Sequence, residues 1–450
     1  MIISLSALIS TQSLSQHEID LPYKQIPLIE RLVFSNNNIM VKVDTTFAQE
    51  FLKTDIFFAE YDESIDLSQL DETVLSIPFI MAVIPIVWAS DRSWFIESMD
   101  QDLYHSLLNI KKVFKLFYPS MAWDGELVPQ RLVKNRPVKQ PDGCATDVAL
   151  LFSGGLDAVC SSIDHHDKRQ LLITVCGSDI RIHKKHMWTC VQQDVCNYAQ
   201  QYGHQNAFVR SNFGLLSSRR LSKLTPQIRK WWACTSQALG YTGLAAPICF
   251  CTGNRRLLIA STRTRECPFP YGTHPLIDNA ISYAGITITH DGADYDRLKK
   301  IEVIVERCKQ YSMSLPTLRV CWGHHEDGGN CCRCEKCLRT MNELLAVGAD
   351  PQQLGFDCSA DKMMDITRAY LKNRKHFSLG LAWHWGCIQN YVIKPEHQIL
   401  YDELTKNYFS WLATMPISAC SSVSFSNQEQ SFFANLWDAS MNGTLDYALL

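Results

Sequence analysis

Residues 150–158 read Leu150-Leu151-Phe152-Ser153-Gly154-Gly155-Leu156-Asp157-Ala158, in which an apolar run leads into a Ser-Gly-Gly-x-Asp turn. The apolar run predicts a strand, and two consecutive glycines let the backbone approach a ligand that side chains would exclude. A helix that begins directly after the turn would add unpaired N–H groups, which is typical of a cradle for phosphate. These residue types could also form an ordinary turn, but their place at the start of a strand–helix series favours nucleotide binding.

Strands and helices alternate from residue 147 onward, which predicts an α/β fold with a parallel sheet and helices on both faces. Strands are expected over residues 148–152, 171–175, 207–209, 257–260, 286–289 and 318–321. Helices are expected over residues 187–202, 227–248, 298–308 and 338–345.

The flanking regions carry no catalytic signature, and we divide the chain into residues 1–140, 144–345 and 346–450. The first region is predicted to be an α+β domain. Within it we expect a first strand or buried arm in 1–15, strands at 39–43 and within 77–88, and a helix over 102–117. Residues 128–143 contain three prolines and predict a linker. The last region is predicted to be helical.

Composition narrows the class of protein. The 450 residues carry a net charge of −3, with 46% apolar and 20% charged residues, as in ordinary globular proteins. No general polyanion-binding surface follows, so a nucleic-acid partner is not expected. The 18 cysteines form no disulfide framework, and the first residues fit neither a signal peptide nor a membrane span, so we expect a cytoplasmic protein.

Four cysteines form a second motif, Cys321, Cys331, Cys334 and Cys337, with the spacing C-x9-C-x2-C-x2-C. Four thiolates at such spacing suit a closed tetrahedral zinc site, which is structural because no coordination position stays open. The alternative is a set of reduced core cysteines. Cys332 could replace Cys331 as a ligand, and His324 and His325 are further substitutes.

The glycine turn and the cysteine motif together resemble the ATP pyrophosphatase (PP-loop) superfamily, and within it the 7-cyano-7-deazaguanine synthase (QueC-type) family. The resemblance covers about residues 147–345, and the first cysteine gap is one residue longer than in that family. It implies an adenine nucleotide alpha-hydrolase-like (Rossmann-like) fold that uses ATP, Mg²⁺ and Zn²⁺. The residues that it implies for the nucleotide are Phe152, Ser153, Gly154, Gly155, Leu156 and Asp157.

Two positions of the turn need comment. By the same resemblance, Asp157 would assist magnesium or orient the loop. The family pattern ends in Ser or Thr, whereas this chain has Ala158, so one hydroxyl donor to phosphate is missing. Such a hydrogen bond is worth about 1.5–3 kcal/mol, and Ser161 or Ser162 could replace it.

Residues 261–278 form a third segment, rich in proline and glycine, which follows the fourth expected strand. Ligands of open α/β sheets bind at the carboxyl ends of strands, and arginine pairs well with carboxylate or phosphate. We therefore expect catalytic roles for Arg263, Arg265 and His274 beside Asp157, and substrate contacts from Tyr271, Thr273, Asp278 and Asp291. The alternative is a structural loop with surface charges, and Asp291 could simply cap a helix.

The resemblance implies an AMP-forming carbon–nitrogen ligase that adenylates a carboxylate, expected to be 7-carboxy-7-deazaguanine, for amide or nitrile formation. The extra regions resemble those of related proteins in anti-phage defence operons. Ammonia, a protein acceptor or another operon-encoded protein is the expected partner, and an oligomer is possible.

Two alternatives stay open. The chain could be a non-catalytic nucleotide-binding subunit, which Ala158 favours, or a tRNA-modifying PP-loop enzyme. The second would use basic residues near two tryptophans, although a solvated helix face is the simpler interpretation. The residues concerned are Arg219, Arg220, Lys223, Arg229, Lys230, Trp231 and Trp232.

Overall fold

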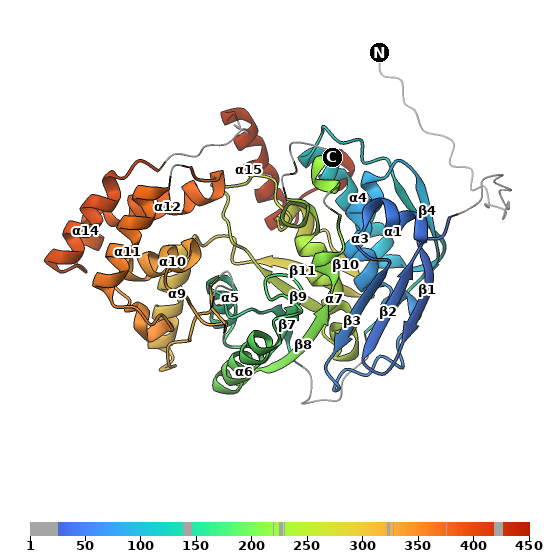
Figure 1. Cartoon of the computed structure of the whole chain (residues 1–450), viewed down its shortest axis with the longest axis horizontal. Helices are drawn as coiled ribbons and strands as arrows, with labels where there is room; N and C mark the ends of the chain where they lie inside the picture. The colour runs from blue at the N-terminus through green and yellow to red at the C-terminus, as the bar shows by residue number, and fades with distance from the viewer. Residues whose placement is uncertain are drawn as a thin grey trace, which may run out of the picture.

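The computed structural model describes residues 26–137, 146–218, 220–224, 228, 230–321, 325–326, 328–374, 376–417 and 426–450, with only the backbone of residue 222 (Figure 1). The strand or arm expected in residues 1–15 therefore lies outside the described residues. So do residues 138–143 of the expected linker and position 227, where a helix was expected to begin.

A nine-stranded sheet forms the centre of the molecule, in the order β1-β2-β3-β8-β7-β6-β9-β11-β10. Its strands are β1 Ile29–Phe34, β2 Asn38–Val43, β3 Ile56–Tyr61, β6 Val148–Leu151, β7 Gln170–Cys176, β8 Gln205–Ser211, β9 Arg256–Ala260, β10 Ser282–Tyr283 and β11 Ile286–Asp291. The five strands from β8 to β11 pair in parallel. Their chain order across the sheet reads 3-2-1-4-5, so the order reverses between β6 and β9, where doubly wound sheets bind ligands. The predicted α/β fold with a parallel sheet is therefore confirmed for these five strands.

Helices cover both faces of the sheet. The helices of the described residues are α1 Thr45–Phe51, α2 Glu72–Leu75, α3 Ile77–Ala89, α4 Gln101–Phe117, α5 Leu156–Asp164, α6 Lys185–Tyr202, α7 Gln237–Cys251, α8 Pro275–Asp278, α9 Arg297–Gln310, α10 Glu335–Ala346, α11 Ala360–Asn373, α12 Leu379–Val392, α13 Pro395–Gln398, α14 Glu403–Thr414 and α15 Asn427–Met441. Because side chains alternate along a strand, Ala149 of β6 packs into one core with α3 and α7, while Leu150 packs into the other with α5, α6 and α9.

The first region is continuous with this sheet. β1, β2 and β3 form an antiparallel ladder, and β3 pairs antiparallel with β8 (Figure 1). Strands from both sides of the boundary expected near residue 140 thus belong to one sheet. The strand expected at 39–43 and the helix expected over 102–117 are present as β2 and α4.

Two elements of this region differ from the prediction. The apolar run 77–88 forms the helix α3 rather than strands, with Pro78 in the first turn and Pro85 inside. It is buried on all sides, so it shows no helical periodicity that sequence reasoning could use. Residues 126–133 form β5 (Glu126–Val133), which pairs in parallel with β4 (Ser93–Asp100), so the expected linker begins with a strand.

The strand expected at 318–321 is also absent. The backbone N–H of Leu318 donates to Leu354 O at 2.9 Å, and that of Arg319 donates to Gly154 O at 2.7 Å. These partners lie at the end of a 3-10 helix (Pro351–Leu354) and in the glycine turn rather than in a neighbouring strand, so no ladder forms.

The last region is helical, as predicted. Helices α10 to α14 form a lobe beside the sheet, and α15 returns to pack against α8 (Figure 1). Among the described residues, no helix combines the length and the apolar character that a bilayer crossing requires.

Candidate nucleotide and metal site

The glycine turn lies where the strand order reverses. β6 ends at Leu151, and α5 begins at Leu156 after Gly154, which has a φ of +72°. That backbone conformation favours glycine, and a Cβ at Gly154 would lie 3.4 Å from the Cβ of Arg319.

The N–H groups of this turn are open to a ligand. The first bond of α5 runs from Val159 N to Gly155 O, and no side chain caps the helix. Within the described part of the chain, the N–H groups of Gly154, Gly155 and Leu156 donate to no protein acceptor. A turn with free donors at a helix N-terminus is suited to an anion.

Arg319 lies directly against this turn. Its Nη2 and Nε donate to Ser153 O at 2.7 and 3.1 Å, while its backbone N–H binds Gly154 O. Burial lowers the pKa of this guanidinium, although Asp179 and Asp194 act in the opposite direction. The segment expected to be a strand therefore delivers a cation to the glycine turn.

Asp157, in the first turn of α5, is held by two cations. Lys300 Nζ lies 3.0 Å from its Oδ1, and Arg297 Nη1 lies 3.2 Å from its Oδ2. Burial opposes ionisation, but Lys300 and Arg297 outweigh it and lower the pKa of Asp157 to about 2. Both oxygens are thus engaged, and of the two expected roles this geometry suits orientation of the loop.

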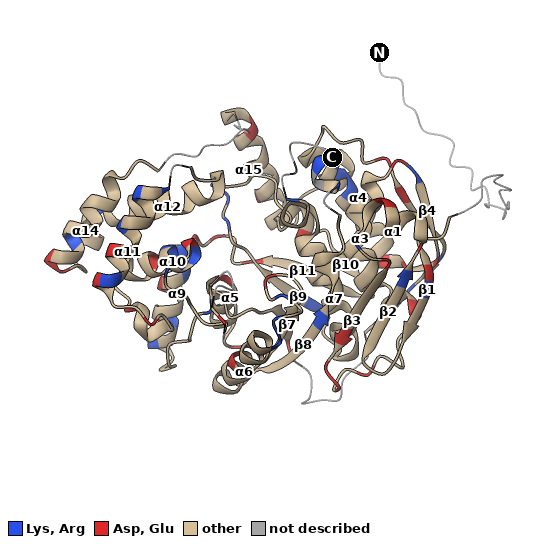
Figure 2. Cartoon of the chain, in the orientation of Figure 1, with Lys and Arg blue, Asp and Glu red and all other residues tan. Residues whose placement is uncertain are grey.

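A buried charge network continues from Asp157 into α10. Arg297 Nε binds both carboxylate oxygens of Glu343 at 3.0 Å, and its Nη2 donates to Thr340 at 2.8 Å. Burial raises the pKa of Glu343 against the attraction of Arg297. Arg339 and Glu335 pair at 2.9 Å beside it. Figure 2 shows the charges of α9 and α10 gathered in this part of the molecule.

Lys336 adds a further cation at the start of α10. Burial lowers the pKa of its ammonium, against the attraction of Asp179 and Asp157. It lies between Cys334 and Cys337 in sequence, so a metal ion that holds these two cysteines would also hold the backbone of Lys336 in place.

The four predicted cysteines come together in one cluster. Their Sγ atoms lie within 4.8 Å of one another, with Cys321–Cys334 and Cys331–Cys337 at 4.0 Å. Four sulfurs that surround zinc at about 2.3 Å lie about 3.8 Å apart, so the cluster could bind a metal such as zinc. The backbone N–H of Cys334 donates to Cys331 Sγ at 3.3 Å, which suits a thiolate.

The structure tests two of the three alternative zinc ligands, Cys332 and His325. Cys332 is buried with a φ of +53°, and its Sγ faces Asn330 O rather than the cluster. His325 is described and does not belong to the cluster, whereas His324 lies outside the described residues.

The predicted substrate loop divides into two parts. Arg263 stacks over the Tyr271 ring at 4.5 Å and donates from Nη1 to Phe269 O at 3.1 Å. Arg265 instead forms an exposed ion pair with Asp438 of α15, with its Nε 2.6 Å from Oδ2. These two arginines are therefore not brought together.

His274 has a structural position. Its Nδ1 accepts from the backbone N–H of Leu276 and its Nε2 faces Pro268 O, so it caps α8. Burial lowers the pKa of His274 to about 3. Thr273, next to it, is half-buried.

The two predicted acids of this segment face other protein groups. Asp278 is buried, and its Oδ2 lies 2.6 Å from His290 Nδ1, whose Nε2 faces the hydroxyl of Ser261 at 2.8 Å. Burial raises the pKa of Asp278. Asp291 Oδ1 lies 3.0 Å from His165 Nε2. Asp291 is not brought to the glycine turn but to the C-terminal end of α5, which His165 caps.

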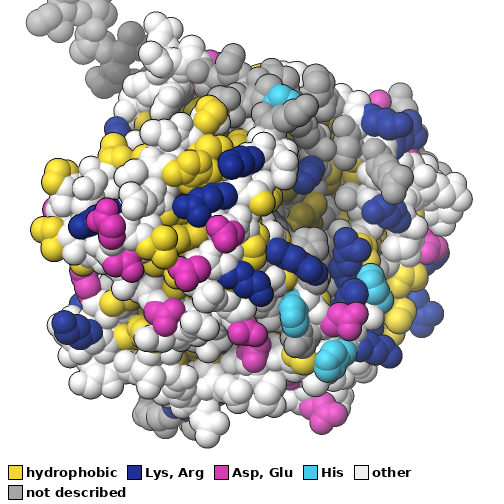
Figure 3. Space-filling view, turned by 60° about the vertical axis from the view of Figure 1, so that its left-hand side comes forward, with side chains coloured by type: hydrophobic (Ala, Val, Ile, Leu, Met, Phe, Trp, Pro, Cys, Tyr) yellow, Lys and Arg dark blue, Asp and Glu magenta, His cyan; other side chains and the backbone are white. Residues whose placement is uncertain are grey.

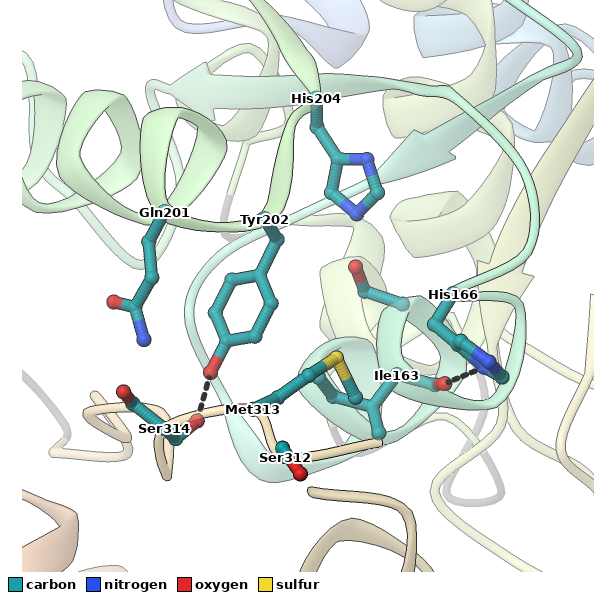
Figure 4. Close-up of a pocket in the computed structure, with 9 residues that line it drawn as sticks. Ile163, His166, Gln201, Tyr202, His204, Ser312, Met313 and Ser314 are labelled. Atoms are coloured by element: carbon teal, nitrogen blue, oxygen red, sulfur yellow. Dashed lines mark hydrogen bonds between the residues drawn. The ribbon is translucent and has the colours of Figure 1, made fainter. Parts of the chain in front are cut away.

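The two serines considered as replacements for the missing hydroxyl lie away from the turn. Ser161 lies near Asp291 and helps to lower the pKa of that carboxyl, and Ser162 lines a cavity of about 330 Å³ at the other end of α5. Figure 4 shows that cavity, where Tyr202 donates to Ser314 O at 2.7 Å. Position 158 is thus without a nearby substitute from either serine.

The basic cluster near residue 231 is not an aromatic platform. Trp231 is buried, and Trp232 packs edge-on against Phe213 at 4.9 Å. Arg219 and Arg229 lie outside the described residues. Of the two tryptophans that the simpler interpretation expects to be buried, Trp231 is buried and Trp232 is half-buried.

Comparisons with family models, with curated proteins and with solved structures each found no match to this chain.

Sequence reasoning missed four cations of the site, namely Arg297, Lys300, Arg319 and Lys336. Two of them had a usable signal, because Arg319 lies two residues before Cys321 and Lys336 lies between two further cysteines. Figure 3 shows one face of the molecule with a recess that has Lys and Arg side chains along its rim.

Proposed function

We propose that the chain is an ATP-dependent ligase of the PP-loop type with an adenine nucleotide alpha-hydrolase-like (Rossmann-like) domain. It adenylates a carboxylate, with 7-carboxy-7-deazaguanine as the leading candidate, and passes the acyl group to ammonia or a protein amine. A role in anti-phage defence goes with this proposal.

One observation carries the proposal, namely that the open N–H groups of the Gly154–Gly155 turn lie beside Arg319 at the reversal point of the sheet. Free donors, a helix N-terminus and a guanidinium in one place match the charge and shape of a polyphosphate. The 3-2-1-4-5 strand order supports the same ligand class.

The chemistry divides between the reactants and the protein. A carboxylate oxygen attacks the ATP α-phosphorus, the bond to the bridging oxygen breaks, and pyrophosphate leaves with the electron pair. An amine nitrogen then attacks the acyl carbon and releases one proton to solvent, and AMP leaves with the former carboxylate oxygen. Magnesium, when bound with ATP, would neutralise part of the phosphate charge.

The protein positions these groups and stabilises charge. The turn N–H groups and Arg319 would bind phosphate oxygens, with Lys336 as a further cation. Asp157 would fix the first turn of α5 through Lys300 and Arg297. Zinc in the four-cysteine cluster would be structural, because it anchors the segments that carry Arg319 and Lys336.

The direct test is pyrophosphate release by the full-length protein with ATP, Mg²⁺ and candidate acids. We expect release that depends on the acid and that Gly154→Val abolishes, because the added side chain meets a left-handed backbone beside Arg319. Gly443→Val is a matched control, since Gly443 also has a positive φ but lies in open space after α15. Absence of release with every deazapurine acid would count against the ligase.

A second function, a nucleotide-binding subunit without turnover, is favoured by Ala158. This side chain lies in the first turn of α5 and offers no hydroxyl to phosphate. Calorimetry with ATP distinguishes the two functions: binding without pyrophosphate release, alone and with partner proteins, selects the subunit. Ala158→Ser is the informative variant, because gained turnover would identify the missing hydroxyl as the cause.

A further inference from the structure

Helix α12, from the last region, forms part of the wall around the charge network. It packs against α9 and α10, and Trp385 Nε1 donates to Glu335 Oε1 at 3.2 Å. Its N-cap, Ser378, makes no side-chain cap bond, so the N–H groups of its first turn lack a capping side chain. The helix has 14 residues, and its N-terminus carries the positive end of the helix dipole.

A cation lies against this positive end. A Cβ on Gly380, in the first turn of α12, would lie 3.2 Å from Nη2 of Arg263. Arg263 is half-buried and, among the described residues, has no carboxylate partner. A guanidinium beside a helix N-terminus is unfavourable by itself, and an anion between the two would make both contacts favourable.

His384 lies on the same face of α12 as Gly380. It follows Gly380 by one helical turn, and residues four apart in a helix lie on the same face. His384 is 6% exposed, and no described residue forms a hydrogen bond with its ring nitrogens. Burial, with the nearby cations, lowers its pKa well below the usual value, which keeps the imidazole neutral. The cations that act on it are Arg339, Arg297, Arg263 and Lys300.

We propose that Arg263, His384 and the first turn of α12 bind one oxyanion group, a carboxylate or a phosphate, of the ligand held at the glycine turn. This subsite rests on the proposed function for the identity of that ligand, whereas its donors come from Arg263 and α12 and do not include the glycine turn. The imidazole N–H, the free guanidinium N–H groups and the helix N–H groups are its donors. The last region therefore completes the ligand site rather than extending the fold.

The experiment uses the full-length, zinc-loaded protein and two probes, inorganic phosphate and pyrrole-2-carboxylate, measured by calorimetry. His384→Phe fills the same space without a donor, and His384→Gln restores one. His397→Gln is the matched control. His397 lies on α13, where its ring stacks on that of Tyr391 at 3.7 Å, away from these cations. Thermal unfolding shows that each variant is folded.

We expect His384→Phe to weaken at least one probe about 10-fold or more, as for a lost hydrogen bond to a charged group. His384→Gln should recover most of that loss, and His397→Gln should bind as the unsubstituted protein does. The probe that responds tells carboxylate from phosphate.

The subsite is overturned if His384→Phe and the unsubstituted protein bind both probes with equal affinity. It is also overturned if the unsubstituted protein binds neither probe. Calorimetry with an ATP analogue separates the two proposals. If the unsubstituted protein binds a probe but not the ATP analogue, the nucleotide function is refuted and the subsite is not. ATP binding that His384→Phe leaves unchanged, together with unchanged probe binding, refutes the subsite alone.

Discussion

Asp157→Asn is the most informative single substitution in this protein. The carboxylate lies between Lys300 and Arg297, whose side chains are 1% and 3% exposed. The amide keeps the shape but not the charge, so two buried cations lose a shared counter-charge. The substitution tests whether Asp157 orients the loop by this ion pairing.

The size of the effect follows from the pKa of Asp157. Its fall from 3.8 to about 2 corresponds to about 2.4 kcal/mol of stability at neutral pH. Because the pKa is lowered in the folded state, this stability is present above the unfolded pKa and is lost as pH falls through about 2. Loss of one partner from a buried ion pair typically costs about 3–5 kcal/mol. We therefore expect a loss of about 2–5 kcal/mol at pH 7.

The assay is urea unfolding followed by tryptophan fluorescence at pH 7 and at the lowest pH where the protein stays folded. Asp164→Asn is the matched control on the same helix, because Asp164 pairs with Arg307 at a more exposed position. That pair should be worth no more than about 1 kcal/mol. The difference between unsubstituted protein and Asp157→Asn should shrink on acidification.

Two results would refute this reasoning. The first is a loss of stability in Asp157→Asn no larger than in Asp164→Asn. The second is a difference that stays constant, or grows, as the pH falls toward 2, since a protonated Asp157 and an asparagine carry the same charge.

Three further outcomes follow from the same structure. Cys331→Ser should lower the unfolding temperature and weaken ATP binding, whereas Cys332→Ser should not change metal content, as metal analysis and calorimetry will show. Gly154→Ala should cost about 1–2 kcal/mol in urea unfolding, because the left-handed backbone disfavours a Cβ and Arg319 lies close; unchanged stability would contradict this. His274 has its pKa lowered to about 3, so its stabilising effect is present above the unfolded value near 6.5 and falls below it. His274→Gln should therefore flatten the stability profile between about pH 6.5 and 3, and a profile identical to that of the unsubstituted protein would argue against it.

The parts that sequence reasoning predicted have local causes. The glycine turn could be predicted because a φ of +72° and a close approach of the backbone favour glycine. The strand before the turn and the helix after it are also adjacent to it in sequence. The four cysteines are visible because thiolates around one ion need short, regular spacing. The parallel strands are visible because buried strands are short apolar runs.

The missed elements show the limit of the same reasoning. The run 77–88 is apolar at nearly every position, so periodicity cannot separate a buried helix from a strand, and it became α3. Arg265 and His274 carry the right chemistry in the expected loop, yet Asp438 and the α8 backbone engage them. Residue type alone does not tell which partner a side chain will find.

By itself, therefore, the sequence determined the strand–helix alternation, the open glycine turn and the metal-binding spacing, because each depends on neighbouring residues. The tertiary structure alone decided that Lys300 and Arg297 lie at Asp157, 143 and 140 positions away, and that α12 reaches Arg263. Such pairs form only when folding brings distant segments together. A buried charge without a partner is costly, so the fold places an opposite charge beside it.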